Sequence, residues 1–174
     1  MKKSTLLLSI FMLSLVSIFA KAQTPDAMIK EWERAKTYTK EYLDAMPEDG
    51  YAFKPTPEMR SFAEQMLHLT DANFGLGALA SNTKSPIERG AAEKSADKSK
   101  AATTKMVMDG YDFVINAIKN MKPEQFQENV KFMAYEMTRA TLFNKIFEHQ
   151  THHRGQATVY LRLKGVKAPQ EKLF

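Results

Sequence analysis

The stretch TRATLFNKIFEHQTHHRGQATVYLRL, residues 138–163, decides the fold because its apolar side chains recur with the period of a helix. The apolar members of this stripe are Leu142, Ile146, Ala157 and Tyr160. His149 and His153 fall on the same stripe, and Gly165 and Pro169 mark the end of the pattern. The stretch is therefore predicted to be a long amphipathic helix whose buried face carries two imidazoles.

Three further stretches share this period, and the four together predict an all-α protein, a four-helix bundle. They cover approximately residues 25–46, 57–80 and 106–121. Residues 87–105 contain no large apolar side chain except Ile87 and are predicted to be a loop or the solvated end of a helix. Residues 129–132 alternate weakly, which indicates a short extended segment.

Composition limits the chemistry available to such a bundle. The chain has 174 residues, 44% of them hydrophobic, which suffices for one domain with a single core. It contains no cysteine, which excludes disulfides, thiolate metal sites and a cysteine nucleophile. Its seven glycines form neither of the common phosphate-binding loops. Metal or acid–base chemistry therefore falls to histidine, carboxylate, amide, tyrosine and lysine side chains.

The first 22 residues have the organisation of a secretory signal peptide. Two lysines precede an apolar run over residues 5–19, and Ala20-Lys21-Ala22 has the pattern of a cleavage site. The run is shorter than the roughly 18 to 20 residues of a spanning helix, so no stable membrane anchor is expected. With no cysteine after it, a lipoprotein is excluded. We expect an exported protein, periplasmic or secreted, with residues 23–174 as its mature domain.

The charge of that mature domain argues against nucleic acid as a partner. The whole chain has a formal net charge of +5, but residues 1–22 contain three lysines and no acidic residue. Without them, 22 basic residues face 20 acidic ones. Because a nucleic-acid binder needs a concentrated basic face, we expect no nucleic-acid binding.

The spacing of His149 and His153 indicates a metal site. Residues four apart on a helix lie about 5 to 6 Å apart at Cβ, close enough for two imidazoles to share one ion. An unpaired polar group on a buried face costs about 1 to 3 kcal/mol, so the pair needs either a metal ion or buried carbonyls and water. His152 lies about 60° away around the helix, at the rim of such a site or on the solvated surface.

A stable site needs a third ligand, and the sequence offers several. His68 lies in the middle of the 57–80 stretch, opposite its apolar stripe and among small residues. That face is either exposed or closely approached by another helix. Asp71 and Glu64 flank His68 by three and four residues, so a carboxylate is an alternative ligand or a partner that orients an imidazole.

Two blocks of the sequence resemble the DinB superfamily, also called the DinB/YfiT-like group. The first is DAMPEDGYAFKPTPEMRSFAEQMLH, residues 44–68, which leads into Asp71-Ala72-Asn73. The second is HQTHHRGQ, residues 149–156, followed by YLRLKGVKAP at 160–169. The resemblance covers nearly all of the mature domain. It implies a bundle with an up-down-down-up arrangement and a divalent metal ion held by His68, His149 and His153, with one position open.

The resemblance also suggests an activity. Three imidazoles with open positions suit Zn, Ni, Fe or Mn, and such an ion activates a bound water molecule or thiol. Relatives include thiol-dependent transferases and isomerases. We therefore expect a metal-dependent hydrolase or thiol transferase that acts on a small-molecule substrate. Candidate bases are Asp71, Glu64 and His152, and Gln156 and Tyr160 are expected to line the pocket.

Two other functions fit the same residues. A metal-binding bundle without catalysis would store or sense the ion, or use it to hold the core together. A bundle that serves protein contact, such as a homodimer, would carry the histidines incidentally. A cavity beside the histidines would favour the enzyme.

Overall fold

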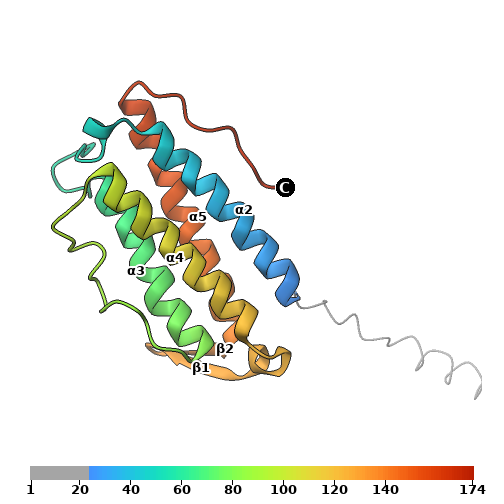
Figure 1. Ribbon diagram of the computed structural model, residues 1–174. Helices are drawn as coiled ribbons and strands as arrows, with labels where there is room; N and C mark the ends of the chain where they lie inside the picture. The colour runs from blue at the N-terminus through green and yellow to red at the C-terminus, as the bar shows by residue number, and fades with distance from the viewer. Residues whose placement is uncertain (1–23) are drawn as a thin grey trace, which may run out of the picture.

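Four long helices form the molecule, and the all-α four-helix bundle predicted from the sequence is confirmed (Figure 1). The computed structural model describes residues 24–174, so the predicted signal peptide at 1–22 lies outside the described residues. The helices are α2 (Pro25–Ala45), α3 (Phe62–Ser81), α4 (Lys100–Asn120) and α5 (Arg139–Leu163). Within residues 24–174, none of the helices combines the length and the apolar character needed to cross a bilayer.

Each of these helices begins after a residue whose side chain accepts a hydrogen bond from a free backbone N–H. The capping residues are Thr24, Ser61, Ser99 and Thr138. One predicted start was wrong. α3 begins at Phe62 rather than near residue 57, because Ser61 and Glu64 form a capping box there. α4 begins at Lys100, so residues 100–105 form the polar end of a helix, one of the two structures predicted for the 87–105 segment, and residues 87–99 lie outside any helix.

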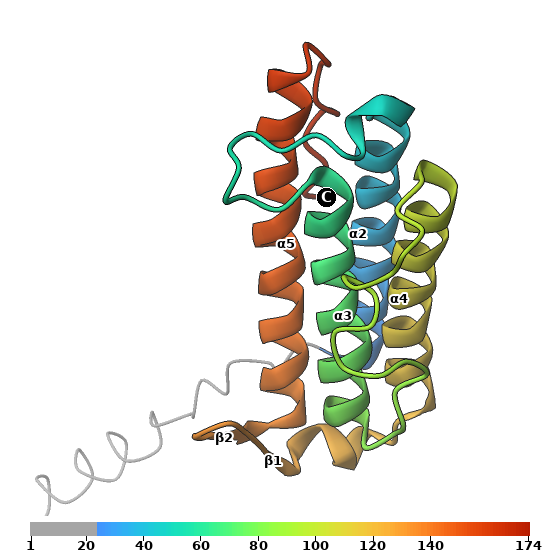
Figure 2. The same cartoon turned by 90° about the vertical axis from the view of Figure 1, so that its left-hand side faces the viewer.

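Helices α3 and α4 run in the same direction, as the up-down-down-up arrangement requires (Figure 1). A Cβ atom added to Gly110 would lie 3.0 Å from Cγ2 of Thr70, and one added to Gly77 would lie 3.1 Å from Cγ2 of Val114. Thr70 thus faces Gly110 and Gly77 faces Val114, so residue numbers increase in the same direction along both helices, as they do in a parallel pair. The connection between them, residues 82–99, returns along the outside of α3 (Figure 2).

A short hairpin closes the end of the bundle where α3 and α4 stop (Figure 2). The 3₁₀ helix η2 (Pro123–Gln127) leads into β1 (Asn129–Phe132), which pairs antiparallel with β2 (Tyr135–Thr138). Another 3₁₀ helix, η1 (Glu48–Gly50), follows α2. The extended segment expected at 129–132 is present. Its partner strand was missed because its few residues carry no periodic signal of their own.

A buried polar cluster joins α2, α4 and α5 in the middle of the core. The hydroxyl of Tyr111 donates to Gln150 Oε1 at 2.8 Å and lies 2.7 Å from the hydroxyl of Thr39. The guanidinium of Arg154 donates to the same Gln150 oxygen at 2.8 Å and lies 4.6 Å from the centre of the Tyr38 ring. These contacts fix the rotation of α5 about its axis, and so direct its other face toward α3.

Candidate metal centre

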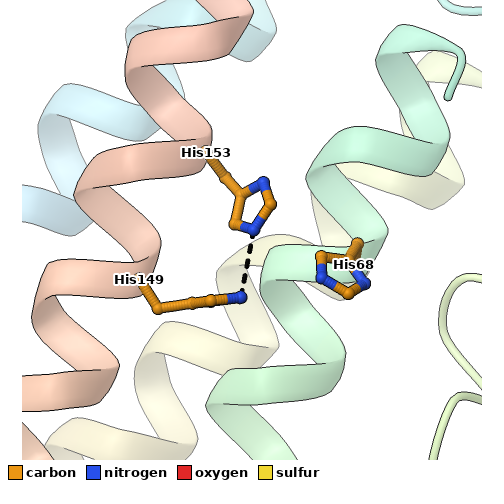
Figure 3. Close-up of side chains that lie close together, drawn as sticks. All are labelled: His68, His149 and His153. Atoms are coloured by element: carbon orange, nitrogen blue, oxygen red, sulfur yellow. Dashed lines mark hydrogen bonds between the residues drawn. The ribbon is translucent and has the colours of Figure 1, made fainter. Parts of the chain in front are cut away.

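Three histidines meet between α3 and α5 (Figure 3). His149 and His153 lie one turn apart on α5, with their Nε2 atoms 3.0 Å apart. His68 approaches from α3, and its ring centre lies 4.8 Å from that of His153 and 5.4 Å from that of His149. One nitrogen of each ring lies within 4.8 Å of the others. The structure therefore brings together all three residues that the resemblance implied as ligands.

Hydrogen bonds on the far side of two rings orient them toward a common point. Nδ1 of His68 lies 2.9 Å from Oε2 of Glu93, and because a carboxylate only accepts, this nitrogen donates. Its Nε2 then carries the free lone pair. Nδ1 of His153 lies 2.9 Å from the side-chain amide of Gln65. Ligand histidines commonly hold such a partner on the nitrogen that does not bind the metal.

The donor set fits a divalent transition-metal ion. Two nitrogens bound tetrahedrally to one zinc ion at about 2.1 Å are about 3.4 Å apart. The 3.0 Å between Nε2 of His149 and His153 and the 4.8 Å limit for all three rings lie on either side of that value. Nδ1 of His149 is buried without a hydrogen-bond partner within residues 24–174. Packing and the contact between its Nε2 and His153 therefore orient this ring.

Burial keeps the α5 histidines neutral. It lowers the pKa of His149 to about 4, with His68 adding to the shift. Burial, followed by His149, lowers the pKa of His153 to about 3. Burial alone would raise the pKa of Glu93, but hydrogen bonds from Arg60 and His68 lower it. At neutral pH the site therefore combines two unprotonated imidazoles on α5, the form that binds metal, with an ionised carboxylate at Glu93.

The two carboxylates considered as a third ligand or base have structural contacts instead. The oxygens of Asp71 accept from the backbone N–H groups of Ala92 and Glu93, at 3.0 and 2.9 Å, and so fasten the 82–99 connection to α3. Oε2 of Glu64 accepts from the backbone N–H of Ser61 at 2.8 Å. Neither belongs to the converging group, whose third member is an imidazole.

The remaining predicted residues lie near the histidines along α5. His152 is exposed, with its ring centre 5.0 Å from that of His153. Its Nε2 lies 2.8 Å from the amide nitrogen of Gln156. Tyr160 is buried one turn further along, and its hydroxyl donates to the backbone oxygen of Arg60 at 2.8 Å. Gln156 therefore borders the centre, and Tyr160 supports the chain that leads into α3.

Sequence reasoning missed Glu93 and Gln65. Gln65 is a buried polar residue three positions before His68, and an amide among apolar neighbours was a usable signal. Glu93 lies in a polar segment that was interpreted as solvated, and no pattern distinguishes it from the other acids there. A cavity of about 470 Å³ opens beside His68, whose side chain is 31% exposed, so this ring of the group is accessible to small molecules.

The fold and the site define a class of protein: a helical bundle whose two middle helices are parallel, with a three-histidine group of which His68 lines a cavity. Residues 19–173 match the model of the DinB family, and the chain belongs to this family. The resemblance predicted from the two sequence blocks is thereby confirmed.

Relatives share the fold over most of the chain. An uncharacterized protein, YrdA, from Bacillus subtilis (strain 168) is 26% identical over 152 residues, 84% of this chain and 87% of that protein. A DinB-like protein from Bacillus cereus ATCC 10987 superposes with a TM-score of 0.72 at 20% identity, covering 87% of this chain and 99% of its own. The DinB-like protein YjoA from Bacillus subtilis gives 0.65 at 17% identity, covering 84% and 95%.

Proposed function

We propose that the protein is a metal-dependent enzyme that uses His68, His149 and His153 to hold one divalent ion and activates a water molecule at its open side. The observation that carries the proposal is the convergence of three imidazoles from two helices, one of which, His68, also lines an accessible cavity. An ion that only held the core together would need no such access. Hydrolysis of a small molecule is the reaction that follows, and a thiol in place of water would give a transferase.

When bound, the ion supplies Lewis acidity, which lowers the pKa of a water molecule or thiol in its open position. The protein's own residues supply orientation and proton transfer. Glu93 holds the proton of His68 Nδ1, and Gln65 fixes the ring of His153. Of the three candidate bases, His152 is the one whose ring is exposed beside the centre, since Asp71 and Glu64 bind backbone amides. We assign the proton-accepting role to it.

Metal content tests the ligand set directly. Protein purified without a histidine tag is expected to bind one Zn, Ni, Fe or Mn ion per chain, measured by mass spectrometry of the metal. His153→Ala and His68→Ala should lose it. His152→Ala is the matched control, because it removes an imidazole from the same helix and should retain the metal. Unchanged metal content in His153→Ala would contradict the proposal.

Turnover separates an enzyme from a metal-binding bundle. A panel of small esters and amides, with and without added thiols, is assayed on metal-loaded protein, on chelated protein and on His152→Ala. We expect hydrolysis that disappears with chelator and returns with metal. His152→Ala should turn over about 10² to 10⁴ times more slowly while it keeps its metal. A metal-loaded protein with no activity on any of the panel would favour the non-catalytic function.

We also propose that the protein acts outside the cytoplasm, on the basis of the signal pattern in residues 1–22. N-terminal sequencing of the protein recovered from a periplasmic or culture fraction tests this, with Gln23 as the expected first residue. Recovery of the uncleaved chain from the cytoplasm would contradict it. In an exported protein, cytoplasmic thiol cofactors are scarce, which favours water as the activated group.

A further inference from the structure

The cavity that His68 lines extends along α3, well beyond this residue. Its volume of about 470 Å³ falls within the range of about 300 to 1,000 Å³ that is usual for small-molecule sites. α3 forms one wall from His68 to Leu79, a length of about 16 Å at the rise of a helix. Residues 85–93 of the return connection form the facing wall, and Phe132 of β1 borders the end near the hairpin.

The α3 wall is open close to the histidines and apolar further away. Ala72 and Gly75 follow His68 at about one and two turns, and a Cβ atom added to Gly75 would have nothing within 4 Å. A glycine inside a helix is less favourable than alanine by about 1 kcal/mol, and no packing contact requires one here. Its effect is to leave space in the cavity. Leu76 and Leu79 then provide an apolar surface.

The acidic groups at the histidine end of the cavity are already engaged. Both oxygens of Asp71 accept backbone hydrogen bonds, and the carboxylate of Glu93 contacts Arg60 and His68. At the rim, Glu88 and Arg89 are adjacent, exposed and opposite in sign. The carboxylates of Asp71 and Glu93 are thus held by hydrogen bonds, Glu88 and Arg89 offset each other, and the surface between these groups is apolar.

We infer that this cavity binds an uncharged apolar substituent of the substrate, an alkyl chain or an aromatic ring, while the polar reacting group lies at the histidines. The position of the reacting group rests on the proposed function, whereas the apolar subsite rests on the cavity itself. Ile87, Leu79 and Phe132 surround the substituent. Each methylene buried there strengthens binding about fourfold.

Straight-chain hydroxamic acids, from acetohydroxamate to octanohydroxamate, test the subsite on zinc-loaded protein by calorimetry. The head group binds a metal ion and the tail reports on the cavity. We expect affinity to rise about fourfold per methylene until the cavity is filled. Gly75→Leu should weaken octanohydroxamate binding at least tenfold and leave acetohydroxamate unchanged, and Gly75→Val is a smaller substitute that fills less space.

Two variants control for the change itself. Gly75→Ala alters the same position without filling the cavity, and Gly155→Leu adds the same side chain at an exposed α5 glycine whose Cβ position is equally open. Both should retain the chain-length dependence. A second measurement needs no metal: 1-hexanol added to metal-free protein should shift the backbone amide signals of Gly75, Leu79 and Ile87 in nuclear magnetic resonance spectra.

The outcomes distinguish the subsite from the metal centre. Binding of all hydroxamates with equal affinity, together with no shift by 1-hexanol, overturns the apolar subsite and leaves the metal centre standing. A protein that binds no zinc but shows the three shifts overturns the metal-dependent function and supports the subsite. Chain-length dependence that survives in Gly75→Leu and Gly75→Val also overturns the inference, because the tail then lies elsewhere.

Discussion

At the scale of a single residue, Glu93 orients one ring of the three-histidine group. Its carboxylate accepts a hydrogen bond from Nδ1 of His68 at 2.9 Å and also pairs with Arg60 at 2.6 Å. A negative charge behind an imidazole makes the opposite nitrogen a better donor to a metal ion and restricts rotation of the ring. From a connection outside the four helices, Glu93 would thus influence an ion held by His68 without being a ligand itself.

Replacing Glu93 should therefore weaken metal binding without removing a ligand. Glu93→Ala is expected to lower zinc affinity about 10- to 100-fold, and Glu93→Gln by less, because the amide oxygen still accepts a hydrogen bond. Competition with a chelator of known affinity measures the change. Glu88→Ala, an exposed acid in the same segment, should bind zinc as the wild type does. Equal affinity for all four proteins would show that Glu93 does not position His68.

The sequence was sufficient to pair site residues that lie on the same helix, because helix geometry alone sets the distance between them. His149 and His153 could be paired because spacing alone fixes their distance on α5. His68 could not be joined to them by periodicity, since its approach depends on how α3 packs against α5, and the family resemblance supplied it. Glu93 was beyond reach because it arrives through an irregular connection that Asp71 fastens to α3.

At the scale of the element, the contact between α3 and α4 depends on glycine. At Gly110 a methyl group would lie 3.0 Å from Cγ2 of Thr70. Thr70 cannot yield easily, because it is β-branched, fully buried and bonded through its hydroxyl to the backbone oxygen of Met66 at 2.9 Å. At position 110, helix propensity favours alanine, whereas the close packing of α3 against α4 favours glycine.

Gly110→Ala and Gly75→Ala should have opposite effects on stability. At Gly75 the added methyl meets open space, so the free energy of unfolding should rise by about 0.5 to 1 kcal/mol. At Gly110 overpacking costs about 1 to 3 kcal/mol, which outweighs the same helix gain. Urea denaturation of the three proteins measures both changes. Stabilisation by Gly110→Ala would show that Thr70 moves aside.

The capping box of α3 makes stability depend on pH. The hydrogen bond from the Ser61 backbone is the main cause of the lowered pKa of Glu64, and Lys54 adds to it. Because the folded-state pKa lies below the usual 4.5, the ionised group contributes stability above pH 4.5, and this contribution is lost as the pH falls through the folded-state pKa.

Glu64→Gln keeps a capping side chain but removes the titration. The variant should be less stable than the wild type at pH 7, and the difference should shrink as the pH falls below about 4.5. Denaturant unfolding at pH 7, 5, 4 and 3 provides the comparison. A difference that stays constant over this range would mean that Glu64 acts through packing rather than through its charge.

The positions of the helices were largely predictable, and so were the starts of α2 and α5. The helical period located all four, because an amphipathic stripe must be buried. The start of α3 was placed five residues too early, because the prediction overlooked the Ser61–Glu64 capping box that sets it. The start of α4 could not be placed from periodicity, because its first turns carry no large apolar side chain.

At the scale of the whole molecule, the histidines connect two helices through one point. α3 contributes one imidazole and α5 two, so a bound ion links elements that are far apart in the sequence. An ion that binds the folded protein and not the unfolded chain stabilises the fold by mass action.

Metal removal should therefore lower the melting temperature. At a free zinc concentration 100 times the dissociation constant, the stabilisation is about 2.7 kcal/mol. Thermal unfolding followed by circular dichroism, with zinc and with chelator, measures the shift. It should vanish in His153→Ala and persist in His152→Ala. A shift of equal size in both variants would place the zinc elsewhere on the molecule.

The parallel course of α3 and α4 has a consequence for how new specificities arise in this architecture. Because α3 and α4 are parallel and consecutive, the chain must return along the full length of the bundle between them. A long connection is therefore unavoidable. Here that connection also forms one side of the cavity beside His68. Exchanging residues 82–99 between relatives would change the shape of this cavity and leave the four helices and the three histidines as they are. This segment is therefore the natural target for engineering which molecules the cavity accepts.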